Sequence, residues 1–261
     1  MTLLRHELRQ DRRALTVWTA CIGLLIAVCI LLYPDIKGEM EGMSRLFATM
    51  GAFSAAFGMD RLNFGTLTGF YAVECGNILG LGGAFFAALT GISALAGEER
   101  SHTAEFLLTH PVSRSRVVLE KLLAVLVQVL VLNIAVYALS VASVALIGEA
   151  VPWRELSLLH LAHLLLQLEV ACVCFGLSAY LRAGGAGLGL GLAVGLYFLN
   201  LIANLTESAR FLRYITPFAY ADGAELLTRN ALDMALVLPG VAYAAAAVAL
   251  AFRHYGRKDI H

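Results

Sequence analysis

The chain has 261 residues, of which 59% are hydrophobic and 15% are charged, and its formal net charge is zero. A soluble domain carries about a quarter charged residues, so this composition is too apolar for one. A neutral chain also offers no basic surface for a nucleic-acid partner, and we expect none. The five cysteines lie mostly within apolar stretches, which is typical of buried thiols rather than of a disulfide framework.

Six apolar stretches are long enough to cross a membrane. A helix needs roughly 20 apolar residues to do so, because its backbone groups must be satisfied within the segment. One stretch is interrupted once, by Glu169. We therefore predict an all-α polytopic membrane protein in which residues 1–261 form a single transmembrane domain. The predicted spans are residues 14–33, 75–97, 118–148, 156–181, 183–206 and 233–253.

Two segments outside the spans have the pattern of amphipathic helices. Residues 1–13 are basic and place three leucines on one side, which predicts a helix lying at the cytoplasmic membrane surface. Residues 34–74 form a longer connection in which apolar residues recur at helical spacing, so we expect an external segment that follows the outer interface. The recurring residues are Met43, Leu46, Phe47, Met50 and Phe57.

The distribution of basic residues predicts the orientation of the spans. If the N-terminus is cytoplasmic, twelve of the nineteen Lys and Arg residues fall on the cytoplasmic side. Cytoplasmic segments are enriched in these residues, so this orientation is favoured over the reverse one. With six spans, both termini are then cytoplasmic.

The segment between the second and third spans, Gly97–Lys121, combines acidic residues, a Phe-Leu-Leu cluster, a proline and a basic end. Ser101 is a suitable cap for a helix that stops near His110, because Pro111 disfavours its continuation. We expect residues 98–113 to form a cytoplasmic helix. Arg114 and Arg116 then begin the third span, where the helix dipole is unfavourable for cations, so an acidic group or a lipid phosphate is expected near them.

This segment resembles the permease subunits of ABC-2-type ATP-binding-cassette transporters. Those subunits carry a pattern close to E-E-x-x-G-T-x-E-x-L-L-x-x-P-V-S-R, followed by K-x-x-A, after their second span. His102 departs from the pattern, which has glycine there. A second stretch, Thr216–Asp222, is similar to the S-P-F-x-Y-x-D sequence that precedes the last span in the family. The residues that match the first pattern are Glu98, Glu99, Thr103, Glu105, Leu107, Leu108, Pro111, Val112, Ser113, Arg114, Lys121 and Ala124.

The resemblance implies a permease, with exporter activity expected, that is moved by a separate ATP-binding subunit. Residues 98–113 would be the coupling helix that docks on that subunit. The chain contains no G-x-x-x-x-G-K-[ST] loop, so we expect no cofactor in it, no enzymatic activity of its own, and ATP and Mg on the partner. A second permease copy or a related permease is also implied, in a bacterial cell membrane. The expected docking residues are Glu98, Glu99, His102, Thr103, Glu105, Phe106, Leu107, Leu108, Pro111 and Arg114.

Four polar residues within the spans are candidates for a transport pathway. Glu169 is the strongest of them, since an acid at bilayer depth is costly and marks either a pathway or an interior hydrogen bond. Gln128, Asn133 and Asn200 are the others, and interhelical hydrogen bonds explain them equally well. Two rival functions also remain open. The first is an intramembrane enzyme using Glu169 with His160 or His163, and the second is an ion-coupled secondary transporter using Glu169.

Two further patterns are candidates for a metal site and for a contact face. Cys172 and Cys174 are two residues apart on a predicted helix and point in different directions, so we predict no metal site. The glycines of the fifth span recur at two- and four-residue spacing, which suits either packing within one chain or a face that contacts a second permease. These glycines are Gly184, Gly185, Gly187, Gly189, Gly191 and Gly195.

Overall fold

The computed structural model describes residues 2–100, 113–181 and 185–257, with the backbone alone at Thr2, Glu41, Ala48, Gly256 and residues 97–100. Within these ranges the chain is helical and contains no strand, which confirms the all-α prediction. The α-helices are α1 (Thr2–Gln10), α2 (Arg12–Thr49), α3 (Ala52–Ala56), α4 (Leu67–Phe70), α5 (Gly76–Arg100), α7 (Arg114–Leu146), α8 (Trp153–Ser178), α9 (Ala186–Leu205), α10 (Gly223–Arg229) and α11 (Met234–Arg257). The π-helix η1 (Tyr71–Cys75) joins α4 to α5, and η2 (Glu207–Tyr214) and η3 (Pro217–Ala219) are 3-10 helices.

Six helical stretches of the described chain are long and apolar enough to cross a membrane, as the sequence predicts. Each overlaps one of the six predicted spans. Their bounds are Arg12–Met40, Leu67–Ala96, Arg114–Leu146, Trp153–Ser178, Ala186–Leu205 and Met234–Tyr255.

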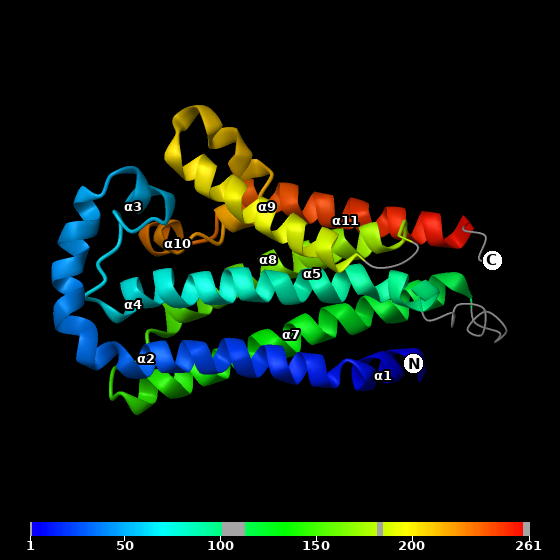
Figure 1. Ribbon diagram of the computed structural model, residues 1–261, viewed down its shortest axis with the longest axis horizontal. Helices are drawn as coiled ribbons and strands as arrows, with labels where there is room; N and C mark the ends of the chain where they lie inside the picture. The colour runs from blue at the N-terminus through cyan, green and yellow to red at the C-terminus, as the bar shows by residue number, and fades with distance from the viewer. Residues whose placement is uncertain (1, 101–112, 182–184, 258–261) are drawn as a thin grey trace.

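The six spans run roughly side by side along the long axis of the molecule (Figure 1). Helix α1 and the C-terminal end of α11 lie at one end of this bundle, which we call the terminal end. Helices α3, α4 and α10 lie at the other end, which we call the distal end. By the distribution of basic residues, the terminal end is the predicted cytoplasmic side.

Helix α2 continues well past the predicted end of the first span at Tyr33. It runs unbroken to Thr49 with Pro34 inside it, and a proline in a helix removes one backbone hydrogen bond and bends the axis. In Figure 1, α2 runs along the bundle and then turns across its distal end. Leu46 is 59% exposed on this later part, whereas Phe47 packs against Phe64. The position of residues 34–74 along the outer interface stays a prediction.

Helices α5 and α8 form the centre of the bundle. In the most apolar stretch of each of these two spans, more than half of the residues are buried. The corresponding share is 22% in the spans of α2, α9 and α11. Glycines on α5 make this close packing possible. A Cβ atom at Gly83 would overlap the Gln167 side chain, and one at Gly91 would overlap the backbone carbonyl of Ala171. The outer helices keep exposed apolar faces, which is the expected surface of a protein in lipid.

The glycines of α9 divide into two groups. Gly189 packs on Ile92 of α5, so it serves packing within the chain. Gly187, Gly191 and Gly195 have open space where a Cβ atom would stand. The second group repeats every four residues and therefore lies along one open side of α9. Gly189 thus takes part in packing within the chain, whereas contact of the open glycines with a second permease stays a prediction.

Candidate functional site

The described parts of the chain on either side of the predicted docking segment, the last turn of α5 and the first turn of α7, lie at the terminal end (Figure 1). Glu98 and Glu99 belong to the last turn of α5, and the structure describes their backbone but not their side chains. Arg114 is the first residue of α7 and is partly buried. The other predicted docking residues, His102, Thr103, Glu105, Phe106, Leu107, Leu108 and Pro111, lie outside the described residues. Their role stays a prediction.

Helix α1 is held against the first turns of α7 by charged groups. The Lys121 Nζ atom donates to the Glu7 Oε1 atom at 3.0 Å, and the Lys121 side chain is only 3% exposed. The backbone N–H of Leu4 donates to Glu120 Oε2, also at 3.0 Å. These two contacts, which we call the α1–α7 clasp, join the predicted interfacial helix to the helix that follows the docking segment.

Glu120 also provides an acidic group near the basic start of α7. Arg116 Nε donates to Glu120 Oε1 at 3.0 Å, one helical turn along α7. For Arg116, the expected acidic group is therefore part of the same helix. The Ser113 side chain caps the helix by accepting from the Arg116 N–H. Sequence reasoning did not single out Glu7 or Glu120.

Gln128, one of the pathway candidates, takes part in the attachment of α1. Its Nε2 atom donates to Asp11 Oδ2 at 3.2 Å, and Asp11 is the residue between α1 and α2. The Gln128 side chain is buried. Its observed contact is thus an interhelical hydrogen bond near the terminal end.

Asn133 belongs to a buried set of polar contacts in the middle of the bundle. Its Nδ2 atom donates to Gln167 Oε1 of α8 at 2.7 Å, and Gln167 Nε2 donates to the backbone carbonyl of Leu79 at 3.2 Å. A chain of contacts therefore links α7, α8 and α5. Buried polar groups with such partners fix the relative position of helices in a membrane.

The three polar residues of the enzyme hypothesis contact different parts of the molecule. His160 Nε2 lies 2.6 Å from the Tyr71 hydroxyl, and His163 packs against Gly76 and Gly80 of α5. Glu169 instead accepts from the Tyr220 hydroxyl at 2.9 Å. Residues six apart on a helix point about 120° away from each other, so His163 and Glu169 do not share a face of α8.

The Glu169 side chain extends from α8 toward α11 and the segment that carries Tyr220. Its side chain is 7% exposed, and a Cβ atom at Gly240 would overlap its carboxyl group. The glycine on α11 thus provides the space that the carboxyl group fills. The sequence left two roles open for Glu169, a transport pathway and an interior hydrogen bond. The structure shows an interior hydrogen bond, with Tyr220.

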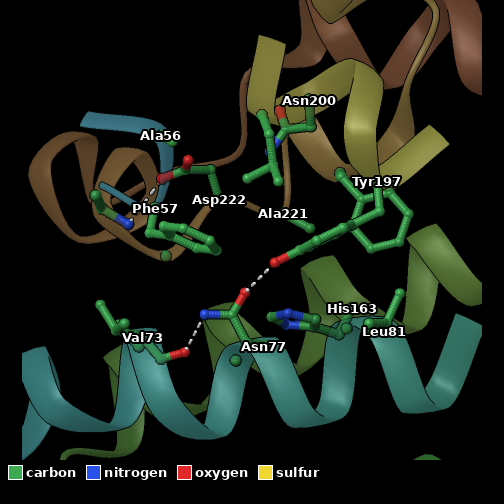
Figure 2. A pocket seen from close by; sticks show the side chains of 17 residues that line it. Ala56, Phe57, Val73, Asn77, Leu81, His163, Tyr197, Asn200, Ala221 and Asp222 are labelled. Carbon is green, nitrogen blue, oxygen red and sulfur yellow. Dashed lines mark hydrogen bonds between the residues drawn. The ribbon is translucent and has the colours of Figure 1, made fainter. Parts of the chain in front are cut away.

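A cavity of about 50 Å³ lies among α3, α5, α8, α9 and the segment before α10, toward the distal end. Figure 2 shows Asn77, His163, Tyr197, Asn200 and Asp222 around it. The Tyr197 hydroxyl donates to Asn77 Oδ1 over 3.4 Å. Asn200, the last pathway candidate, is 7% exposed, and its Oδ1 atom has no hydrogen-bond partner among the described residues.

Charged residues surround Glu225 of α10 at the distal end. Arg61, Arg213 and Arg229 place guanidinium nitrogens 3.1, 3.3 and 2.7 Å from its carboxylate. Burial alone would raise the pKa of Glu225, but the charges of Arg213 and Arg229 outweigh it and lower the pKa below its usual value. We call this group the Glu225 cluster. It ties α10 to η2 and to the chain after α3.

The comparison with known families agrees with this architecture. A model of the ABC-2 family transporter proteins matches residues 1–260. The chain belongs to this family. A search of curated proteins finds no match. This ABC-2 permease is therefore a multi-pass transport protein of a membrane, as the resemblance in the sequence implies.

The permease brings together only some of the residues that sequence reasoning selected. Asn200 lines the cavity with His163, whereas Asn133 contacts Gln167, which was not among the selected residues. Glu169 and Gln128 contact separate places. Asn77, Tyr197 and Asp222 were missed as cavity residues. Asp222 carried a signal, since it closes the Thr216–Asp222 stretch, whereas Asn77 and Tyr197 had only polarity within a predicted span, which many residues share.

Proposed function

We propose that this permease is the membrane subunit of an exporter that a separate ATP-binding subunit drives. ATP and Mg would bind to that subunit, and this chain would perform no covalent chemistry. Residues 98–113 would dock on the ATP-binding subunit at the terminal end, which we assign to the cytoplasm of a bacterial cell. Family membership supports the transport role, and the position of the predicted docking segment between α5 and α7 supports the coupling.

The α1–α7 clasp is the observation that carries this proposal. A displacement of the docking segment would move the start of α7, and the clasp would transmit this movement to α1. Because only Asp11 separates α1 from α2, the movement would continue into the first span. The central helix α5 leads into the docking segment as well. One contact would therefore act on the spans formed by α2, α5 and α7.

Two permease chains would form the transporter, as a homodimer or with a related permease. The open glycines of α9 support this arrangement, because small residues let helices of two subunits approach closely. Substrate would move between the two chains as the complex shifts between inward- and outward-open states.

Co-purification tests the docking step. We expect the gene for this chain to lie beside a gene for an ATP-binding subunit, and the two proteins to purify together when co-expressed. The double variant Glu98→Ala/Phe106→Ala should lose the ATP-binding subunit while remaining in the membrane. A matched control, Glu149→Ala/Phe53→Ala, alters exposed residues of the same types elsewhere and should retain it. Full retention of the subunit by the first double variant would refute docking through this segment.

A further inference from the structure

The cavity near the distal end is lined by the buried amide group of Asn200. Asn200 is 7% exposed, and its Oδ1 atom lacks a hydrogen-bond partner among the described residues. A buried polar atom without a partner is costly, and such atoms are rare in folded proteins. Half a turn of the amide would present either its oxygen or its NH2 group to the cavity. A ligand in the cavity would decide between them.

The other polar groups around the cavity are mostly acceptors. Asn77 Oδ1 receives only the long hydrogen bond from Tyr197, and its own Nδ2 atom is used by the Val73 carbonyl at 2.7 Å. Asp222 Oδ2 accepts from Asn204 Nδ2 at 3.1 Å, and a carboxylate oxygen can accept a second hydrogen bond. The cavity therefore suits a ligand that donates hydrogen bonds.

The charge of the cavity favours a cation. Asp222 is the one acidic residue among the described residues that line it, and no lysine or arginine lines it. Arg61 lies outside the lining and is 3.7 Å from Asp222 Oδ1, so it offsets part of the negative charge. Aromatic residues complete the walls: Phe57, Tyr197 and Phe218. Aromatic faces attract cations, and this attraction adds to that of the carboxylate.

The size of the cavity limits the ligand to a small group. About 10–15 Å³ is enough to hold one water molecule, and this cavity measures about 50 Å³. A group of a few non-hydrogen atoms fits, whereas a bulky substrate does not. We propose that the cavity binds one primary ammonium group, supplied by a small free amine or by the headgroup of an amine-bearing lipid. This site is independent of the docking proposed above and requires no ATP-binding subunit.

Thermal unfolding of the purified chain tests the proposal. The chain would be placed in nanodiscs of phosphatidylglycerol, which has no amine, at neutral pH. Methylammonium chloride should raise the unfolding temperature in a saturable manner, because a ligand that binds the folded state stabilises it. Sodium chloride and tetramethylammonium chloride at the same concentration should not, since neither cation donates a hydrogen bond. An equal rise with all three salts would overturn the proposal.

Two substitutions at Asn200 give opposite expectations. Asn200→Leu removes the acceptor and should raise the half-saturating methylammonium concentration by about tenfold or more. Asn200→Asp places a carboxylate at the same point and should lower it. The exposed Tyr243 on α11 provides a control, and Tyr243→Phe should bind as the unchanged chain does. If Asn200→Leu fails to fold, Asn200→Asp still decides, because weaker or unchanged binding by it contradicts an ammonium site.

The source of the ammonium group is settled by the lipid. If lipid headgroups occupy the site, replacing half of the phosphatidylglycerol with phosphatidylethanolamine should weaken the apparent binding of methylammonium. If free amines are the ligands, the replacement should leave that binding unchanged. Either result supports an ammonium site, provided that methylammonium binds in phosphatidylglycerol alone. Binding that Asn200→Leu leaves intact would refute the site in both lipids.

Discussion

The two ends of the bundle are both held by charged residues, but in different ways. At the terminal end, Lys121 is almost fully buried and meets Glu7 of a short helix. At the distal end, Glu225 has three arginine partners, of which Arg229 is half exposed. The lysine of the terminal ion pair is shielded from water, whereas two of the distal arginines, Arg61 and Arg229, are partly exposed to it. We therefore expect the terminal end to be sensitive to single substitutions and the distal end to be tolerant.

The largest effect is expected from Glu7→Gln. It removes a negative charge beside the buried Lys121 ammonium group and should lower the free energy of unfolding by about 2–4 kcal/mol, near the range for a broken buried ion pair. Chemical denaturation in nanodiscs would measure the loss. The double variant Glu7→Gln/Lys121→Met is the matched control, since it removes both charges and should recover part of the stability. A double variant less stable than Glu7→Gln would contradict this view of the clasp.

At the distal end, Glu225→Gln should cost less. Arg61 and Arg229 are partly exposed and can regain water when the carboxylate is removed, so we expect a loss of about 1–2 kcal/mol. The same denaturation measurement applies. A loss larger than that of Glu7→Gln would reverse the comparison between the two ends.

The Glu225 cluster also predicts a dependence on pH. The pKa of Glu225 is lowered in the folded chain, so its ionised form stabilises the fold above the ordinary pKa of 4.5. This contribution should disappear as the pH falls below 4.5 and passes the lowered value. Unfolding temperatures of the unchanged chain and of Glu225→Gln should converge over that range. Curves that stay parallel from pH 6 down to pH 3 would show that Glu225 gains nothing from its arginines.

The sequence was sufficient for the spans but not for the contacts between them. The length of each apolar stretch sets whether a helix can cross the bilayer, and that information is local. The clasp joins residues 114 positions apart, and nothing near Glu7 or Lys121 in the chain reveals the pair. The same holds for the cavity, where Asn77 of α5 and Asn200 of α9 meet only because the helices pack together.

Glu169 shows why a polar residue within a span does not by itself predict a pathway. The sequence correctly marked it as costly, but its partners, Tyr220 and Gly240, lie on segments that follow it by many residues. Asn200 is the reverse case. Its chemistry is ordinary, and the packing around it leaves its oxygen without a partner in the part of the chain that the structure describes.

The most direct test of the account is the rate of ATP hydrolysis by the ATP-binding subunit bound to this permease in nanodiscs, relative to the rate of that subunit alone. If movement passes through the α1–α7 clasp, the permease should change the rate, and Glu7→Gln should bring it close to that of the free subunit without releasing it. Glu225→Gln should leave the rate of the complex unchanged. Equal effects of the two substitutions, or no effect of Glu7→Gln, would contradict transmission through the clasp.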